Sequence, residues 1–230
     1  MHYIQMIKSK FISFFDLSSK EAFFSYILSI VIFSLAKLTP TIRPYIILIT
    51  LVYIPMFSAK INHIDYLKYG LLNIDIKKSS YYLLIWIITI FPAYFILIFV
   101  FKFGSDFKEH LFTIKLPKDI LYYLAYNIIV VGFSEEFFYR GYLQPLIQKR
   151  FNFQIIPKIK LDTGIIITSL IFGLGHFLTY FTVFSALTFL PSIVFGILRN
   201  QTNNILASVL FHGISNAVLY VIILNIGNIL

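Results

Sequence analysis

A small set of ionisable and amide side chains lies inside long apolar stretches of this 230-residue chain. They fall in three segments, SEEFFYRG, FGLGHF and FHGISN, and the residues are Glu135, Glu136, Arg140, His176, His212 and Asn216. A charged side chain at the centre of a membrane helix costs about 2.5–3.5 kcal/mol on insertion scales, so such groups usually serve a function. An acid combined with two imidazoles suits general acid–base chemistry, either proton relay or hydrolysis by an activated water.

Helical spacing separates the two glutamates. Glu136 and Arg140 are four residues apart with the acid nearer the N-terminus, which favours an ion pair within the helix. Glu135 lies about 100° away around the same helix and has no such partner, so we expect it to face a neighbouring helix. His212 and Asn216 are also four residues apart and share one helix face.

The three polar segments are predicted to reach a common depth. The inner ends of their helices are marked by Lys149, Asp162 and Arg199. Counted from these ends, Glu135, His176 and His212 lie 14, 14 and 13 residues inside. At about 1.5 Å per residue, each is roughly 20 Å from its own end. Phe172 precedes His176 by four residues and is expected to pack beside it.

Each of these residues also has a purely structural interpretation. A lone histidine or asparagine within a membrane commonly forms an interhelical hydrogen bond, and a Glu–Arg pair can simply fix a helix. The shared depth and the acid without a local countercharge favour a functional site. Transport and proton relay compete with hydrolysis at this point.

The composition indicates that helices inside a bilayer position these side chains. Hydrophobic residues make up 59% of the chain and charged residues 13%, against about 25% charged in soluble domains. The mean hydropathy is +0.84. Because a span needs about 20 residues, we expect an all-α polytopic transmembrane helix bundle of about seven spans, within a range of six to eight. The candidate spans are 21–37, 42–59, 80–103, 119–149, 162–178, 181–199 and 203–229.

The spans divide the chain into three predicted parts. Residues 1–20 are expected to form an amphipathic helix at the membrane surface rather than a cleavable signal peptide. Residues 21–118 are expected to supply the N-terminal transmembrane helices, and residues 119–230 are expected to form the core that carries the candidate catalytic groups. The fifth and sixth spans are close enough in sequence to form a tight helical hairpin.

Several smaller features complete the prediction. Pro92 and Pro191 fall inside spans and are expected to bend them. Residues 150–161 are predicted to be a short basic loop. His63 and His110 lie in polar loops and are expected to be solvated.

The net charge of +9 comes mainly from Lys and Arg residues between the spans. The positive-inside rule and anionic lipid explain this distribution without nucleic acid. With the N-terminus inside, the inner side holds 12 of these cations and the outer side 6, which predicts a cytoplasmic N-terminus. The absence of cysteine excludes disulfides, iron–sulfur clusters and thiolate zinc sites. A high content of Lys, Ile, Phe and Asn is typical of an AT-rich genome, so we expect a bacterial cell membrane.

The three polar segments, in this order, resemble the CAAX-protease and bacteriocin-processing family of intramembrane peptidases, also called the CPBP or Abi family. The pattern of this family is Glu-Glu-x-x-x-Arg, then Phe-x-x-x-His, then His-x-x-x-Asn. The chain supplies these as Glu135-Glu136-x-x-x-Arg140, Phe172-x-x-x-His176 and His212-x-x-x-Asn216. The resemblance covers about residues 119–220 and departs from the pattern at no motif position.

The resemblance implies endopeptidase activity on a membrane-associated or hydrophobic peptide. Substrates in this family include prenylated CAAX termini, bacteriocins and peptide pheromones. Peptide hydrolysis needs an activated water, an oxyanion donor and protonation of the leaving amine. Glu135 is the natural general base, His176 would hold or polarise the water, and His212 with Asn216 would donate to the oxyanion.

A second mechanism uses the same residues as metal ligands. Glu135, His176 and His212 form a plausible His₂Glu zinc site with an open position for water. The HExxH motif typical of many zinc proteases is absent. Zinc-dependent and metal-free mechanisms both remain open from the sequence.

Two other functions also remain open. A non-catalytic membrane scaffold or bacteriocin self-immunity protein of the same fold is consistent with the family's immunity associations. A proton- or ion-coupled carrier is suggested by the buried Glu and His residues. Carriers often contain internal repeats and paired broken helices, and neither is visible in the sequence.

Overall fold

The computed structural model describes residues 17–39, 41–61, 70–71, 74–103 and 116–227. Most of the predicted surface helix at 1–20 lies outside this part of the chain, and so do His63 and His110. Residues 17–20 are described and belong to the first helix rather than to a separate surface helix.

The described chain is almost entirely helical, which confirms the all-α prediction. The N-terminal helices are α2 (Leu17–Leu35), followed by the short 3₁₀ helix η2 (Ala36–Leu38), then α3 (Arg43–Ile61) and α4 (Ile76–Phe103). A long rod follows, built from α6 (Ile120–Tyr126), η5 (Asn127–Gly132), α7 (Phe133–Glu136), η6 (Phe137–Leu143) and α8 (Gln144–Gln148). The C-terminal helices are α9 (Thr163–Tyr180), α10 (Val183–Ala186), α11 (Phe189–Thr202) and α12 (Leu206–Gly227).

Five described helical stretches are long and apolar enough to cross a membrane. They are Lys20–Leu38, Arg43–Ile61, Thr163–Tyr180, Val183–Thr202 and Leu206–Leu224. Helix α4 and the rod α6–α8 occupy the other two predicted spans. Many large apolar side chains on these helices are exposed, including Phe24, Tyr53 and Leu121. Such a surface is stable against lipid rather than water, and the chain is an integral membrane protein.

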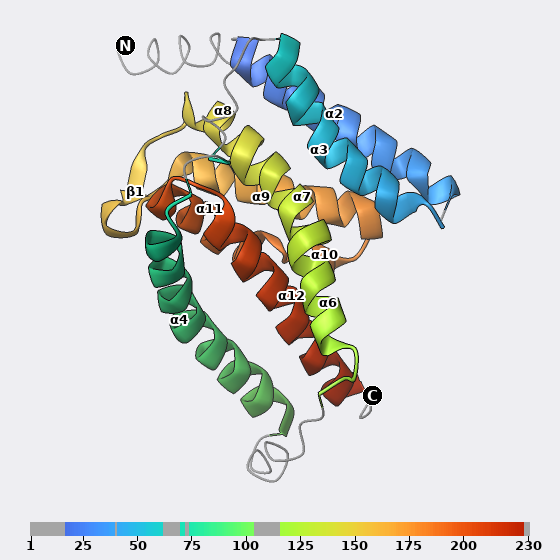
Figure 1. The fold of residues 1–230 in the computed structure, drawn as a ribbon, viewed down its shortest axis with the longest axis vertical. Helices are drawn as coiled ribbons and strands as arrows, with labels where there is room; N and C mark the ends of the chain where they lie inside the picture. The colour runs from blue at the N-terminus through green and yellow to red at the C-terminus, as the bar shows by residue number, and fades with distance from the viewer. Residues whose placement is uncertain (1–16, 40, 62–69, 72–73, 104–115, 228–230) are drawn as a thin grey trace, which may run out of the picture.

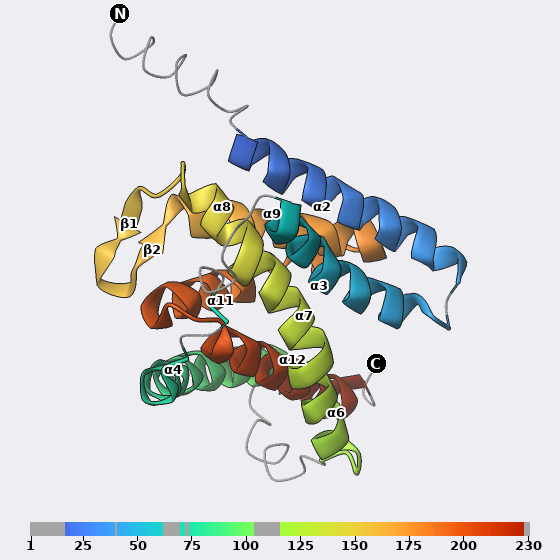
Figure 2. The same cartoon turned by 45° about the horizontal axis from the view of Figure 1, so that its top comes forward.

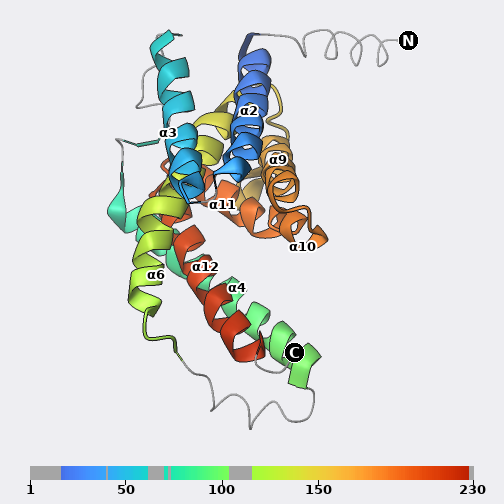
Figure 3. The same ribbon diagram turned by 90° about the vertical axis from the view of Figure 1, so that its right-hand side faces the viewer.

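The helices form two groups that meet at the rod (Figure 1). Helices α2 and α3 run side by side as an antiparallel pair, which Figure 3 shows from the side. Helix α12 lies between α4 and the rod and packs along η5. Helix α9 packs against α11, α8 and α2. This arrangement brings α7, α9 and α12, which carry the three polar motifs, to the centre of the molecule.

Close packing between α12 and the rod depends on a glycine. A Cβ atom added at Gly213 would lie 2.9 Å from the backbone Cα of Ile128, a distance that real Cβ atoms essentially never show. Small residues at such positions let membrane helices approach closely. Because Gly213 follows His212 directly, this contact also places that histidine against the rod.

Two of the predicted spans differ from the observed helices in their boundaries. The sixth span is two helices, because Thr182 caps α10 and a turn at residues 187–188 separates α10 from α11. Pro191 consequently lies in the first turn of α11 and does not bend a helix interior, since first-turn N–H groups have no intrahelical partner. Pro92 does lie within α4, which begins at Ile76 rather than at residue 80. The N-cap of α4 is Asp75, whose carboxylate accepts the Lys78 N–H at 3.0 Å.

The predicted tight hairpin between the fifth and sixth spans is present. Helix α9 ends at Tyr180, and Phe181 adopts a left-handed conformation (φ 54°) before α10 begins. The predicted basic loop at 150–161 is instead a small β-hairpin of β1 (Gln154–Ile156) and β2 (Leu161–Asp162), which projects beyond α8 (Figure 2).

The predicted depth of His212 was wrong, although the helix that carries it was placed correctly. Helix α12 begins at Leu206, so His212 is six residues from its start, about 9 Å at 1.5 Å per residue. Arg199 belongs to α11, which ends where Asn203 turns into the left-handed region (φ 59°). The number of residues between Arg199 and His212 therefore does not give the depth of His212 along α12.

Candidate active site

The polar motif of the rod lies between two π-helical segments. Glu135 and Glu136 are in α7, with η5 before them and η6 after them, and both flanking segments are π-helices. π-Helical turns are rare and occur frequently at functional sites. The wider turns change the angle at which successive side chains leave the rod, and the spacing of an ideal helix does not predict that change.

Glu135 faces the two histidines from the other polar motifs. Its Oε2 atom is 3.9 Å from His176 Nε2 on α9 and 3.8 Å from His212 Nε2 on α12. The three side chains are 15%, 22% and 5% exposed, in that order, so the cluster is largely buried with an edge open at His176. The expectation that Glu135 faces neighbouring helices holds, and the three helices converge on one point.

The hydrogen bonds of the histidines fix which ring nitrogen carries the proton. His176 Nδ1 is 3.1 Å from the Phe172 carbonyl, and His212 Nδ1 is 2.9 Å from Glu136 Oε1. Because a carbonyl and an ion-paired carboxylate can only accept, both Nδ1 atoms are donors. In the neutral imidazoles the Nε2 atoms then present lone pairs toward Glu135.

Three acceptor atoms consequently share one buried space. Glu135 Oε2 has no hydrogen-bond partner among the described residues, and the two Nε2 atoms cannot donate to it while the rings are neutral. A buried acceptor without a partner costs about 1–3 kcal/mol. The arrangement therefore suits a donor placed between the three atoms, such as a water molecule or a cation.

Glu136 and Arg140 lie behind this cluster and contact no solvent. Arg140 Nε is 3.2 Å from Glu136 Oε2, and both side chains are fully buried. Arg140 Nη2 also donates to the hydroxyl (2.8 Å) and the carbonyl (3.2 Å) of Ser192 on α11. The predicted intrahelical ion pair is present, and it continues to His212 through the second oxygen of Glu136.

Aromatic rings surround the arginine and both histidines. The Arg140 guanidinium lies over Phe172 (5.1 Å) and Phe195 (5.5 Å). Phe195 stacks on His212 at 4.7 Å with an interplanar angle of 14°, and Phe172 packs beside His176 at 4.4 Å, as the spacing predicted. These contacts restrict the rotamers of the imidazoles and strengthen the electrostatic interactions by excluding water.

Asn216 forms a hydrogen bond with the rod, which the sequence analysis did not predict. Its Nδ2 donates to Asn127 Oδ1 at 2.9 Å, and Asn127 in turn donates to the Tyr123 carbonyl at 2.8 Å. Asn127 is buried at the start of η5. The structure thus places Asn216 one helical turn from His212, held by the rod, with one of its two amide protons still available.

Two residues of this arrangement were missed in the sequence. Asn127 could have been found as a further amide within an apolar span. Ser192 is a small hydroxyl residue with no periodic relation to Arg140, and nothing in the sequence pairs the two. Their partners are 89 and 52 residues away.

The donor types of the cluster fit a metal ion better than its spacing does. One carboxylate oxygen and two imidazole lone pairs are ligands that zinc accepts. Ligands that share a tetrahedral zinc ion are about 3.3 Å apart, given zinc–ligand bonds of about 2.0–2.1 Å, whereas the separations here are 3.8 and 3.9 Å. Within the described part of the chain no group of three or more His, Cys, Asp or Glu side chains forms a ready metal site.

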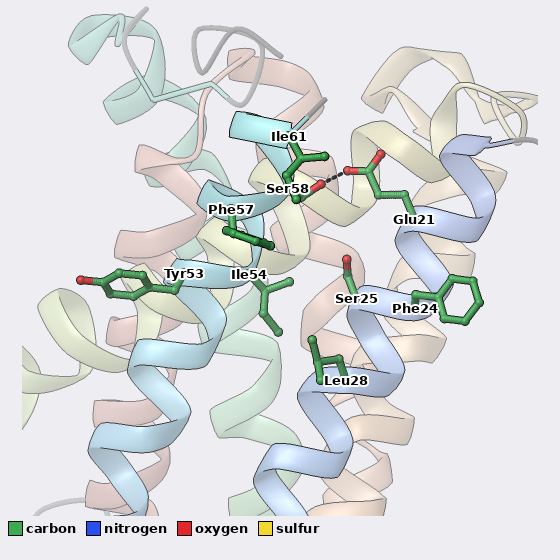
Figure 4. Close-up of a pocket in the computed structure, with 9 residues that line it drawn as sticks. All are labelled: Glu21, Phe24, Ser25, Leu28, Tyr53, Ile54, Phe57, Ser58 and Ile61. Atoms are coloured by element: carbon green, nitrogen blue, oxygen red, sulfur yellow. Dashed lines mark hydrogen bonds between the residues drawn. The ribbon is translucent and has the colours of Figure 1, made fainter. Parts of the chain in front are cut away.

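A separate cavity of about 460 Å³ lies between α2 and α3 (Figure 4). Glu21 closes its polar end by accepting hydrogen bonds from Ser58 and from the Tyr142 hydroxyl, the latter at 2.9 Å. None of its lining residues belongs to the three polar motifs, so it is not the candidate active site. Tyr142 lies in η6, so these hydrogen bonds connect the α2–α3 pair to η6.

Comparison with known proteins found one family match. Residues 117–218 match the family model described as type II CAAX prenyl endopeptidase Rce1-like. No curated protein and no solved structure matched the chain. The matched region contains all three polar motifs and the helices that carry them, which confirms the resemblance seen in the sequence. Residues 117–218 of the chain are therefore similar to the Rce1-like family of type II CAAX prenyl endopeptidases.

Proposed function

We propose that this protein is an intramembrane endopeptidase, and that it hydrolyses a peptide bond with a water molecule held between Glu135, His176 and His212. The observation that supports the proposal is the buried Oε2 of Glu135, which faces two imidazole lone pairs and has no partner among the described residues. A water molecule supplies two protons to such a site and keeps a lone pair for attack.

Glu135 acts as the general base. As the water oxygen forms a bond to the scissile carbonyl carbon, one O–H bond breaks and the proton passes to Glu135 Oε2. The carbonyl π electrons move to oxygen and produce a tetrahedral oxyanion. Collapse of this intermediate re-forms the carbonyl and breaks the C–N bond, and Glu135 returns the proton to the leaving nitrogen.

The histidines and Asn216 support this reaction. His176 Nε2 accepts the second proton of the water and orients it, and the exposed edge at His176 is where the substrate enters. The Asn216 amide is held by Asn127 and donates its remaining N–H to the oxyanion. His212 Nε2 completes the water site, and it donates to the oxyanion when the ring is protonated.

Glu136 and Arg140 are positioning residues in this scheme. Glu136 accepts from His212 Nδ1 and so directs Nε2 toward Glu135. Arg140 holds Glu136 and is itself held by Ser192 on α11. Carboxylate–histidine pairs of this kind fix the tautomer and the ring orientation.

The proposed substrate is a membrane-embedded hydrophobic peptide, of the CAAX type or of the bacteriocin and pheromone type. The apolar surface of the helices supports a site within a bilayer. We propose the three-part organisation of the sequence analysis, with 119–230 as the catalytic core, in a bacterial cell membrane with a cytoplasmic N-terminus.

Peptide cleavage tests the two histidines. We expect His176→Ala and His212→Ala to reduce hydrolysis of a farnesylated CAAX peptide by about 10²-fold or more, since His176 accepts a proton of the water in its hydrogen bond and His212 completes the water site. Mass spectrometry of the products gives rate and cleavage position, and His110→Ala, a histidine outside the polar motifs, is the matched control. Cleavage at the wild-type rate by both variants would remove the histidines from the mechanism.

Metal removal decides between the two mechanisms. Because the spacing of the cluster exceeds that of bound zinc, we expect the purified protein to keep its activity after chelation and to contain less than one zinc per chain. If zinc is instead required, Glu135, His176 and His212 are the residues that would hold it, and it would supply Lewis-acid activation of the water. Loss of activity on chelation, restored by added zinc, would replace the metal-free mechanism.

A further inference from the structure

Arg43 has buried hydrogen-bond donors that the described chain does not satisfy. It is the first residue of α3, and its Cζ lies 5.7 Å from the ring centre of Tyr180, at the C-terminal end of α9. Its Nε and Nη2 atoms are buried and have no hydrogen-bond partner among the described residues. Leaving a charged donor buried without an acceptor costs free energy. These two atoms therefore require an acceptor that the described residues do not supply.

Capping of α9 does not explain Arg43, because another cation does this. Lys37 Nζ is 3.4 Å from the Leu178 carbonyl and lies over the Phe181 ring at 4.4 Å. A cation at this position interacts favourably with the negative end of the helix dipole. Arg43 makes no such bond, although it lies at the same end of the same helix.

The two unsatisfied nitrogens suggest the chemistry of the missing acceptor. Nε and Nη2 carry parallel N–H groups along one edge of the guanidinium. This edge forms the fork that binds both oxygens of a carboxylate. Arginine is favoured over lysine for such bidentate recognition, because the planar group is already arranged for it.

Arg43 lies within the length of a short peptide from His176, one of the residues proposed to hold the catalytic water. The Tyr180 ring is 6.2 Å from the His176 ring, and Arg43 is 5.7 Å beyond it. The distance from the His176 ring centre to Arg43 Cζ is therefore at most about 12 Å, and three residues of extended chain, at about 3.3 Å each, span roughly 10 Å. A peptide held with its scissile bond beside His176 could thus place its third following residue at Arg43.

We propose that Arg43 binds the free C-terminal carboxylate of the substrate and so sets the cleavage position about three residues from that end. This inference rests on the proposed function, and it makes Arg43 a specificity-determining residue. A CAAX motif is C-terminal by definition and ends in a carboxylate three residues after its cysteine, which fits this spacing.

Binding of a peptide to an inactive protein tests the carboxylate contact directly. The probe is a fluorescent farnesylated CAAX peptide with either a free acid or an amide at its C-terminus, added to the Glu135→Gln variant in detergent. We expect the acid to bind about 10- to 100-fold more tightly, as for a hydrogen-bonded charged pair. Adding Arg43→Met should abolish this preference, Arg43→Lys should keep part of it, and Arg150→Met should leave it unchanged.

Peptide length provides a second readout. With the active protein, peptides that have three residues after the cysteine should be cleaved faster than those with one or five, and Arg43→Met should remove this ranking. Equal binding of acid and amide, or a preference that survives Arg43→Met in a folded protein, would overturn the inference. Failure of the proposed function looks different: no peptide is cleaved, yet the inactive variant still prefers the acid.

Discussion

We expect Glu135→Gln to lower peptide hydrolysis by about 10²- to 10⁴-fold, the range for loss of a general base. The amide keeps the size of the side chain but cannot take a proton from water. The ion pair of Arg140 is with Glu136, and Glu135 Oε2 has no hydrogen-bond partner among the described residues. The variant should therefore fold and accumulate in the membrane as the wild-type protein does. The measurement is the cleavage rate of a farnesylated CAAX peptide by purified protein.

The matched control for this substitution is Glu21→Gln. It also removes a carboxylate from a membrane helix, but its contacts are with Ser58 and Tyr142 rather than with the histidines. We expect the control to retain activity. If Glu135→Gln cleaved peptides like the wild-type protein, the base would lie elsewhere. A cellular phenotype that survives Glu135→Gln would favour the scaffold or immunity function, which requires no hydrolysis.

The largest loss of stability is expected for Arg140→Met. This substitution leaves Glu136 fully buried without its countercharge and removes the donor to Ser192. Breaking one side of a buried ion pair costs about 3–5 kcal/mol in the free energy of unfolding. Loss of the cation also removes its contacts with Phe172 and Phe195. Denaturant unfolding in detergent micelles, followed by tryptophan fluorescence, measures the change.

The double variant Glu136→Gln with Arg140→Met separates charge from packing. Because it buries no uncompensated charge, we expect it to recover much of the stability lost in Arg140→Met, as for other replaced buried pairs. Its activity should stay low, since His212 loses the carboxylate that orients it. Equal destabilisation by the single and double variants would show that packing around Arg140, rather than its charge, stabilises the rod.

Much of the architecture follows from the sequence alone. Apolar runs of about 20 residues require membrane helices, and five of the seven predicted spans coincide with described stretches that are long and apolar enough to cross a membrane. The four-residue spacing of Glu136 and Arg140 predicted their ion pair, and that of Phe172 and His176 predicted their ring contact. These interactions lie within one helix, where the helical repeat alone sets which side chains meet.

Helix ends were less predictable. The start of α12, the break between α10 and α11 and the β-hairpin before α9 depend on caps and on left-handed residues such as Phe181 and Asn203. A hydropathy pattern carries little information about such single-residue conformations. For this reason the depth estimate for His212 failed while the helix itself was placed correctly.

The sequence by itself determined that this protein is a membrane helix bundle with polar groups on three helices. Only the tertiary structure decided which atoms of those groups meet. Glu135 rather than Glu136 faces both imidazole Nε2 atoms, Arg140 reaches Ser192, and Asn216 is held by Asn127. Helical periodicity fixes directions around one axis, whereas the rotation and separation of two helices depend on side chains far apart in sequence. Here the π-helical turns beside Glu135 and the close contact at Gly213 set them.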